Sequence, residues 1–167
     1  MNEAPVVRRL KADDVAIWKD IREAALTLAP QSFGSTLARF HSQNDADHVN
    51  KLAGSAVFGA FIDDQIVGSA GWHAIDFPTE HHRGHVTSFF VMPKLQGRGT
   101  ADALMDRIFD NAQRCVLQLE LDVAVTNTRA IAFYNRHGFA FVGTIPRALC
   151  HDGVFTDEHI MLRNLDA

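Results

Sequence analysis

The segment from His85 to Val123 constrains the fold more than any other part of the sequence. Residues His85 to Val91 have the composition of a strand, which Met92-Pro93 ends because proline cannot donate to a ladder. A glycine-rich turn follows, then apolar residues recur at helical spacing from Ala101, and Val116 to Val123 alternate as in a strand. Strands joined through a helix usually lie parallel with a right-handed crossover. We therefore predict a parallel βαβ unit near the middle of a sheet.

Further strands are predicted on both sides of this unit from β-forming composition and alternation. Two of them form a hairpin, because only Asp63-Asp64-Gln65 separates them. The additional predicted strands are Val6–Leu10, Ala56–Ile62, Ile66–His73, Phe139–Ile145 and Phe155–Leu162.

Two further helices are predicted from their periodicity and end signals. The first begins after Asp13 or Asp14 and is closed by Pro30. The second, Thr128 to His137, ends at Gly138, a residue suited to the left-handed conformation that follows a helix. Residues 32–54 are polar and nearly patternless, and we expect one or two short helices there.

Composition and charge narrow the class of protein. The 167 residues, 47% hydrophobic and 22% charged, suit one globular domain spanning residues 1–167. A net charge of −4 argues against nucleic acid as a partner, since such binding relies on basic residues. No apolar stretch approaches the roughly 20 residues of a membrane span. The acidic start has no apolar signal segment behind it, so we expect a cytoplasmic protein.

The turn Gln96-Gly97-Arg98-Gly99-Thr100-Ala101 has the features of an anion site. Its glycines let the main chain pack closely round an anion, and the first turn of the helix offers unpaired N–H groups and the positive end of the dipole. The turn is neither a Gly-Lys-Ser/Thr phosphate loop nor a complete dinucleotide motif, because Asp102 stands where the latter needs Gly or Ala. A glycine-rich turn without a ligand is the alternative.

Two spaced motifs resemble those of the GNAT superfamily of acetyl-CoA-dependent N-acetyltransferases. The first is Val91-Met92-Pro93 followed by Gln96-x-x-Gly99-x-Ala101. The second lies about thirty residues further on, after the alternating strand. It consists of Asn127-x-x-Ala130-x-x-x-Tyr134 and then Gly138-Phe139. The resemblance spans nearly the whole chain and is weakest from Phe33 to Gly54.

The resemblance implies an α/β fold with a mixed, mostly antiparallel sheet of six to seven strands, a central parallel βαβ unit and helices on both faces. The sheet would splay apart between strands His85–Val91 and Val116–Val123, where the pantetheine arm of acetyl-CoA binds. The residues implied to contact acetyl-CoA are Phe89, Val91, Gln96, Gly97, Arg98, Gly99, Thr100, Ala101, Asn127 and Ala130.

Some of these assignments have structural alternatives. Lys94, Arg98 and Arg129 are candidate partners for the CoA phosphates or ordinary surface residues. Asn127 is a cofactor ligand, a helix N-cap, or both. No metal is expected, because His81, His82 and His85 lack a recognised ligand spacing.

The resemblance places Tyr134, the only tyrosine, at the position of the general acid that protonates the departing thiolate. Packing between helix and sheet is its alternative role. A general base would deprotonate the acceptor amine, and several residues remain open for that role. The candidates are His73, Glu80, His85, Glu120 and Asp122.

The predicted function is transfer of acetyl from acetyl-CoA to a primary amine of a small molecule or peptide. A non-catalytic acyl-CoA-sensing domain is the alternative. Acceptor specificity would depend on loops Pro30–Gly54, Ala74–Gly84 and Ile145–Gly153, whose shapes no pattern fixes. Dimers are common in the family, so a homodimer is compatible with the resemblance, although no sequence feature establishes one.

Overall fold

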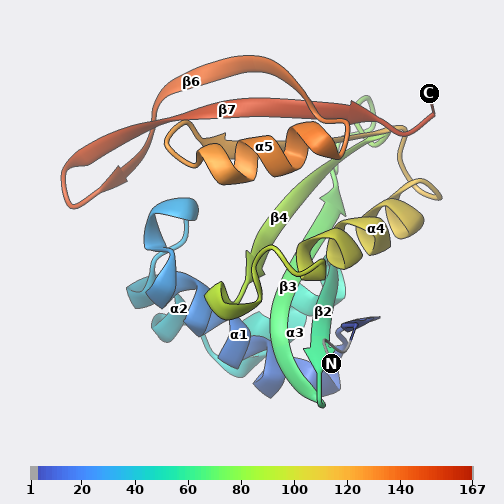
Figure 1. The fold of residues 1–167 in the computed structure, drawn as a ribbon, viewed down its shortest axis with the longest axis vertical. Coiled ribbons are helices and arrows are strands. Elements are labelled where there is room, and N and C mark those ends of the chain that lie inside the picture. The colour runs from blue at the N-terminus through green and yellow to red at the C-terminus, as the bar shows by residue number, and fades with distance from the viewer. Residues whose placement is uncertain (1–3, 167) are drawn as a thin grey trace.

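The computed structural model describes residues 4–166, which form a seven-stranded sheet covered by helices (Figure 1). The strand order is β1-β2-β3-β4-β5-β7-β6. The strands are β1 (Val6–Arg9), β2 (Ala56–Ile62), β3 (Gln65–Ala74), β4 (Arg83–Val91), β5 (Gln118–Ala124), β6 (Ala140–His151) and β7 (Val154–Asn164). This arrangement confirms the predicted mixed sheet with its βαβ unit in the middle.

The only parallel pair among these strands, β4 with β5, is short. It runs from Arg83 opposite Gln118 to His85 opposite Glu120 and then stops, although both strands continue. All other neighbouring strands are antiparallel. The sheet is therefore split between the far halves of β4 and β5.

Helices lie on both faces of the sheet (Figure 1). The chain forms α1 (Val15–Leu28), α2 (Leu37–Ser42), α3 (Asp45–Gly54), α4 (Thr100–Ala112) and α5 (Thr128–Arg136). Successive side chains of β2 point to opposite faces of the sheet and so into different helix layers. Phe58 packs in the core with α4 and α5, whereas Val57 packs with α1 to α3. The apolar positions of α4, Leu104, Met105 and Ile108, are fully buried, which confirms the predicted amphipathic helix.

Several predicted boundaries are confirmed. Helix α1 ends at Leu28, and Pro30 begins the short 3-10 turn η2 (Pro30–Ser32). The β2–β3 hairpin turns at Asp63 and Asp64, both with positive φ, as a two-residue hairpin turn requires. Gly138, with φ of +81°, follows α5.

The prediction of a loop from Ile145 to Gly153 is wrong. Strand β6 continues to His151 and pairs with β7 at Leu149, so only Asp152 and Gly153 remain as the turn. The ladder is irregular between Ile145 and Leu149, and this bulge contains Pro146. Because β6 is an edge strand, a proline at a bulge does not end it.

No helix formed by residues 4–166 combines the length and apolar character needed to cross a bilayer.

Candidate active site

A cavity of about 490 Å³ lies where β4 and β5 separate. Val91 and Phe89 of β4 line it on one side, and Asp122 and Val123 of β5 line it on the other. The turn before α4, helix α5 and the segment at η2 complete the walls. Asp122 points to the face opposite the buried Leu121 and Val123, so the cavity passes between the two faces of the sheet.

A bulge in β4 shapes the wall of this cavity. The pairing of β3 with β4 shifts between Ser69 and Gly71, and Ser88 has a φ of +57°, a strained value for a serine. Beyond the bulge, the N–H of Met92 donates to the carbonyl of Val67 at 2.9 Å, toward the neighbouring strand. Main-chain groups of alternate strand residues point to opposite sides, so those of Phe89 and Val91 point away from β3. They face the gap that β5 leaves open.

The turn before α4 is built to accept an anion. Gly97 and Gly99 have φ values of +77° and +85°, which favour glycine. The N–H of Ala103 makes the first bond of the helix, to the carbonyl of Gly99 at 3.0 Å. The N–H groups of the three residues between them therefore have no partner within the helix. A Cβ on Gly99 would meet nothing within 4 Å, so the concave side is open.

Gln96 braces this turn against both neighbouring elements. Its Nε2 donates to the carbonyl of Val91 at 3.0 Å, and its Oε1 accepts from Nη1 of Arg129 at 2.8 Å. The Arg129 guanidinium also lies 3.6 Å from where a Cβ of Gly97 would stand. A positive charge from α5 is thus held beside the glycine turn.

Tyr134 lines the cavity and is 9% exposed. Its ring packs edge-on against Phe89, Phe133 and Phe139, at centroid distances of 6.1, 5.4 and 5.8 Å. Burial raises the pKa of its phenol well above the ordinary value, so it keeps its proton at neutral pH. It can donate a proton but cannot serve as a base there.

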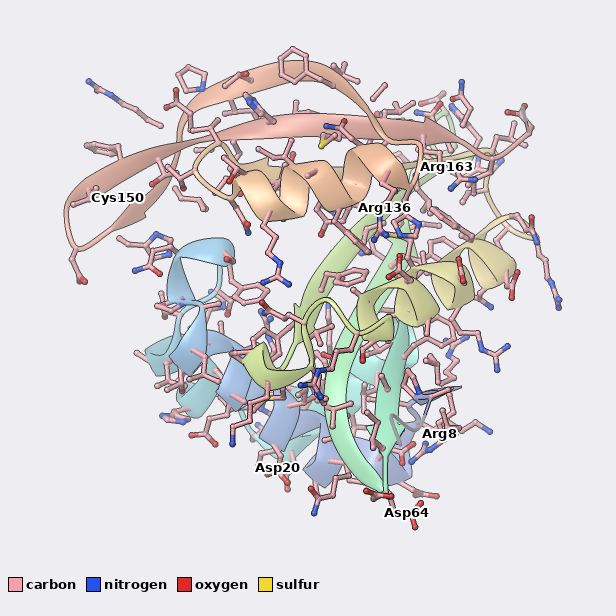
Figure 2. The ribbon with its side chains drawn as sticks, viewed as in Figure 1. Arg8, Asp20, Asp64, Arg136, Cys150 and Arg163 are labelled. Atoms are coloured by element: carbon pink, nitrogen blue, oxygen red, sulfur yellow. The ribbon has the colours of Figure 1, made fainter. Side chains whose placement is uncertain are left out.

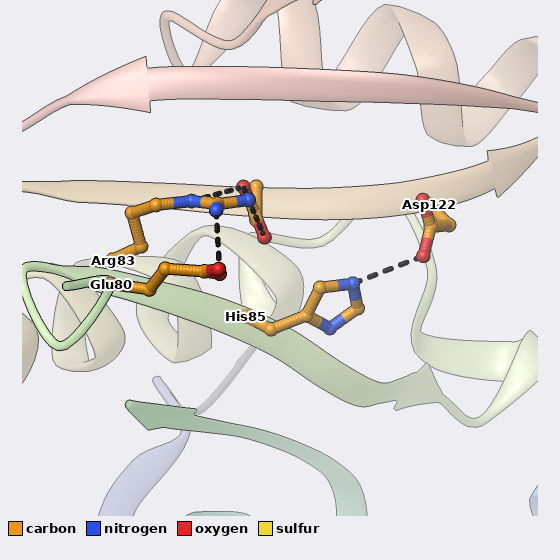
Figure 3. A network of polar contacts seen from close by, with 5 residues as sticks. Glu80, Arg83, His85 and Asp122 are labelled. Carbon is orange, nitrogen blue, oxygen red and sulfur yellow. Dashed lines mark hydrogen bonds and ion pairs between the residues drawn. The ribbon is translucent and has the colours of Figure 1, made fainter. Parts of the chain in front are cut away.

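Four of the five candidate bases fall into two groups (Figure 3). Arg83 engages both Glu80 and Glu120, each at 2.8 Å, so these carboxylates are already paired. His85 Nε2 lies 3.0 Å from Asp122 Oδ2, and Asp122 lines the cavity. The sequence did not separate these groups, because Glu120 and Asp122 lie on the same face of β5.

His73, the fifth candidate base, lies next to His85, and the centroids of the two rings are 5.9 Å apart. Burial, together with the charges of Lys51 and His85, lowers the pKa of His73, and its buried Nδ1 has no hydrogen-bond partner within residues 4–166. Glu158 of β7, which the sequence analysis missed, has a raised pKa caused by burial and then by the charge of Asp122. Of these polar groups only Asp122 lines the cavity, and His73, His85 and Glu158 surround it on the face of α1 to α3.

Residues 18–139 match the acetyltransferase (GNAT) family. The chain belongs to this family. Acetyl-CoA is accordingly its acetyl donor, and the glycine turn with its free N–H groups fits the donor's diphosphate. No curated protein sequence matches the chain significantly.

Solved structures share the acetyltransferase fold over nearly the full length. The yncA protein of Salmonella typhimurium, solved with its cofactor acetyl-CoA, is 19% identical with a TM-score of 0.84, over 99% of this chain and 96% of that one. A GNAT-family acetyltransferase from Streptococcus pneumoniae is 18% identical, with a TM-score of 0.84 over 96% and 99%. Ribosomal-protein-alanine N-acetyltransferase from Brucella melitensis is 20% identical, with a TM-score of 0.80 over 95% and 99%.

Most of the residues predicted for this acetyltransferase site share the one cavity. Those that line it are Phe89, Val91, Gln96, Gly97, Gly99, Ala101, Asn127, Ala130 and Tyr134. Asn127 also caps α5, because its Oδ1 accepts from the N–H of Ala130 at 3.2 Å. The predicted N-cap role is therefore confirmed, while cofactor contact stays a prediction for each residue.

Two predicted residues lie outside the lining. The Arg98 side chain is exposed, and Thr100 is 1% exposed with a buried hydroxyl that has no hydrogen-bond partner in the described part of the chain. Only their main-chain N–H groups remain candidates for the diphosphate. Lys94 is also exposed and outside the lining, which leaves Arg129 as the basic residue of the original three that borders the cavity.

The predicted acceptor loop Pro30–Gly54 contributes Ser32 and Phe33 to the wall, whereas the sequence analysis missed Ala29, which follows α1. It also missed Arg136, which lines the cavity and extends from α5 toward α4 (Figure 2). Arg136 Nη2 lies 2.7 Å from Asp102 Oδ1 in the first turn of α4. No sequence pattern marks these positions. Across residues 4–166 no cluster of three or more His, Cys, Asp or Glu is arranged to hold a metal ion.

Proposed function

We propose that the protein is an N-acetyltransferase that moves acetyl from acetyl-CoA to a primary amine of a small molecule or peptide, by direct attack of the amine on the thioester. One observation carries this proposal: a single cavity contains the glycine turn, the buried phenol of Tyr134 and the carboxylate of Asp122. These are the groups needed to bind the donor, protonate the leaving group and accept a proton from the acceptor.

The donor end would hold acetyl-CoA in an extended form. The N–H groups of Gly97 to Ala101 bind the diphosphate, and Arg129 adds a positive charge beside it. The main-chain groups of Phe89 and Val91 in the open gap bind the pantetheine arm, as the resemblance implies. When bound, acetyl-CoA supplies an activated thioester carbonyl.

The acceptor must reach the carbonyl as a neutral amine. A lysine-like ammonium has a pKa of about 10.4, so a proton acceptor increases the reactive fraction at neutral pH. Asp122, bonded to His85, is placed for that role directly or through one water. Holding the two reactants in line within the cavity contributes further, up to about 7–11 kcal/mol in well-oriented systems.

Departure of the thiolate is assisted by Tyr134. Its phenol remains protonated because burial raises its pKa, so the proton is present when the sulfur takes on charge. Transfer of this proton completes the reaction: the N–C bond forms, the C–S bond breaks, and free CoA and an amide leave.

The test measures release of free CoA with a thiol reagent across a panel of amines, with mass spectrometry of the products. The panel includes peptides with a free N-terminus, since the Brucella neighbour is named for a ribosomal protein alanine. We expect acetylated product from at least one class. Calorimetric binding of acetyl-CoA without CoA release from any amine would instead support an acyl-CoA-sensing domain.

A further inference from the structure

Helices α1 and α3, which pack on the face of the sheet that carries His73 and His85, bring two cations that form no ion pair within residues 4–166. Arg22 of α1 has a buried Nη1 that makes no hydrogen bond within residues 4–166. Burial alone lowers the pKa of Arg22 to about 10. Lys51 of α3 is also half-buried, and its pKa is lowered by burial and then by the charge of Arg22. Across the same residues, neither side chain forms a salt bridge.

This cationic pair is connected to the cavity on two sides. The Arg22 guanidinium stacks on the ring of Phe33, 4.6 Å from its centroid, and Phe33 lines the cavity. Ala29, which also lines the cavity, lies seven residues after Arg22 and so on the same side of α1. On the other side, the charge of Lys51 acts on His73, whose ring neighbours that of His85, the partner of Asp122.

Two half-buried cations whose charges act on each other are unfavourable unless an anion compensates them. Neutral donors are also unused on this face, because Thr87 Oγ1 and His73 Nδ1 are buried without hydrogen-bond partners among the described residues. Thr87 lies on β4 two residues after His85, on the same face. Cations without ion-pair partners and unused donors on one face of the sheet therefore favour an anion beside them.

We propose that the acceptor is an aminocarboxylate, whose amine lies at Asp122 and whose carboxylate is bound by Arg22 and Lys51. This inference rests on the proposed function, since it names the acceptor of that site. Attraction of the carboxylate to Arg22 and of the ammonium to Asp122 orients the acceptor before it is deprotonated. Arg22 and Lys51 are thus specificity residues that do not touch the reacting atoms.

The first experiment compares matched acceptors. Straight-chain amino acids from glycine to 6-aminohexanoate are assayed beside the corresponding primary amides, with each rate corrected for the fraction of neutral amine. A charge-assisted hydrogen bond predicts a kcat/KM about ten- to hundredfold higher for the carboxylate at the best chain length. Equal rates for carboxylates and amides would overturn the inference and leave the proposed function intact.

The second experiment tests the two residues. Arg22→Gln and Lys51→Gln should each reduce the carboxylate preference about tenfold or more, mainly through KM for the acceptor, with KM for acetyl-CoA unchanged. Arg22→Lys keeps the charge and should retain part of the preference. The control is Lys19→Gln, on the same helix but paired with Asp45 at the surface, which should leave the preference unchanged. A preference unaltered in both Gln variants would overturn the assignment.

Calorimetry separates the two possible failures. The carboxylates are titrated into the protein saturated with CoA, which forms a complex without turnover. If no amine is acetylated, the proposed function fails. Carboxylate binding that Arg22→Gln weakens would still support the anion site, whereas absence of binding would overturn it. Circular dichroism of each variant confirms the fold, and Lys51→Gln carries the test if Arg22→Gln is misfolded.

Discussion

His85 and Asp122 meet across the split in the sheet, Nε2 to Oδ2 at 3.0 Å (Figure 3). His85 belongs to the last parallel pair of β4 and β5, opposite Glu120, and Asp122 is the next residue of β5 on the same face. The contact therefore bridges the two strands where they begin to separate. It holds a carboxylate at the rim of the cavity, on the side away from α4 and α5.

We predict that Asp122→Asn lowers kcat/KM for the amine about a hundredfold, because the isosteric amide cannot accept the proton. KM for acetyl-CoA should change little. The measurement is the initial rate of CoA release at varied amine. Glu120→Gln is the matched comparison, since Glu120 is engaged by Arg83 and its loss should cost less than about threefold. Equal losses in the two variants would contradict the role of Asp122.

Tyr134→Phe should reduce kcat by about 10²- to 10⁴-fold with little change in KM for either substrate, because the proton donor is removed. The ring remains packed against Phe89 and Phe139, so the free energy of unfolding should be nearly unchanged. Since the pKa of the phenol is raised by burial, no limb of the wild-type rate profile below pH 10 should belong to Tyr134. Wild-type turnover in the variant would remove the phenol from the mechanism.

Asp14 should make the stability depend on pH. The Arg8 guanidinium, 2.8 Å away, is the main cause that lowers the pKa of this carboxyl, and the N–H of Lys11 also donates to it at 2.8 Å. A lowered folded-state pKa gives stability that is present above the unfolded pKa of about 3.9 and is lost as the pH falls through the folded value. Asp14→Asn should therefore lower the free energy of unfolding by about 1 kcal/mol at pH 7 and not at all near pH 2.

Urea unfolding of both proteins at the two pH values measures this difference. Asp13→Asn is the control, because Asp13 is the exposed neighbour and its loss should change the stability little at either pH. If Asp14→Asn lost the same free energy of unfolding near pH 2 as at pH 7, the loss would not come from the charge of Asp14.

The donor end of the site was predictable from sequence because its signals are local. The turn requires glycine at positions 97 and 99, because both residues have positive φ values. The helix that follows them is predicted by the periodicity of its apolar residues. The alternation of β5 was predicted, with one exception: Leu117 is 53% exposed, because the strand begins only at Gln118.

The acceptor end was not predictable, because it depends on where distant segments meet. Glu120 and Asp122 are both acidic residues on the same face of β5. Only Asp122 lines the cavity, because it lies beyond the last paired residues of β4 and β5. Phe33 lines the cavity and carries Arg22 on its ring through the packing of α1 and η2, which no short-range pattern encodes. The strand predicted at β6 was too short for a related reason. An edge strand tolerates a proline such as Pro146, but the position of β6 at the edge of the sheet could not be read from its own residues.

Gly99→Ala tests the donor end. Gly99 has a φ of +85° with nothing within 4 Å of an added Cβ, so alanine fits sterically but strains the backbone, by about 1 kcal/mol. Relief of that strain turns the N–H groups at the start of α4 away from the anion, so the affinity for acetyl-CoA should fall about tenfold. Gly153→Ala is the matched control, with a φ of +81° and equally open surroundings in the β6–β7 turn. It should lose similar stability in urea and no calorimetric affinity for acetyl-CoA. The same affinity in both variants would mean that the glycine turn does not hold the diphosphate.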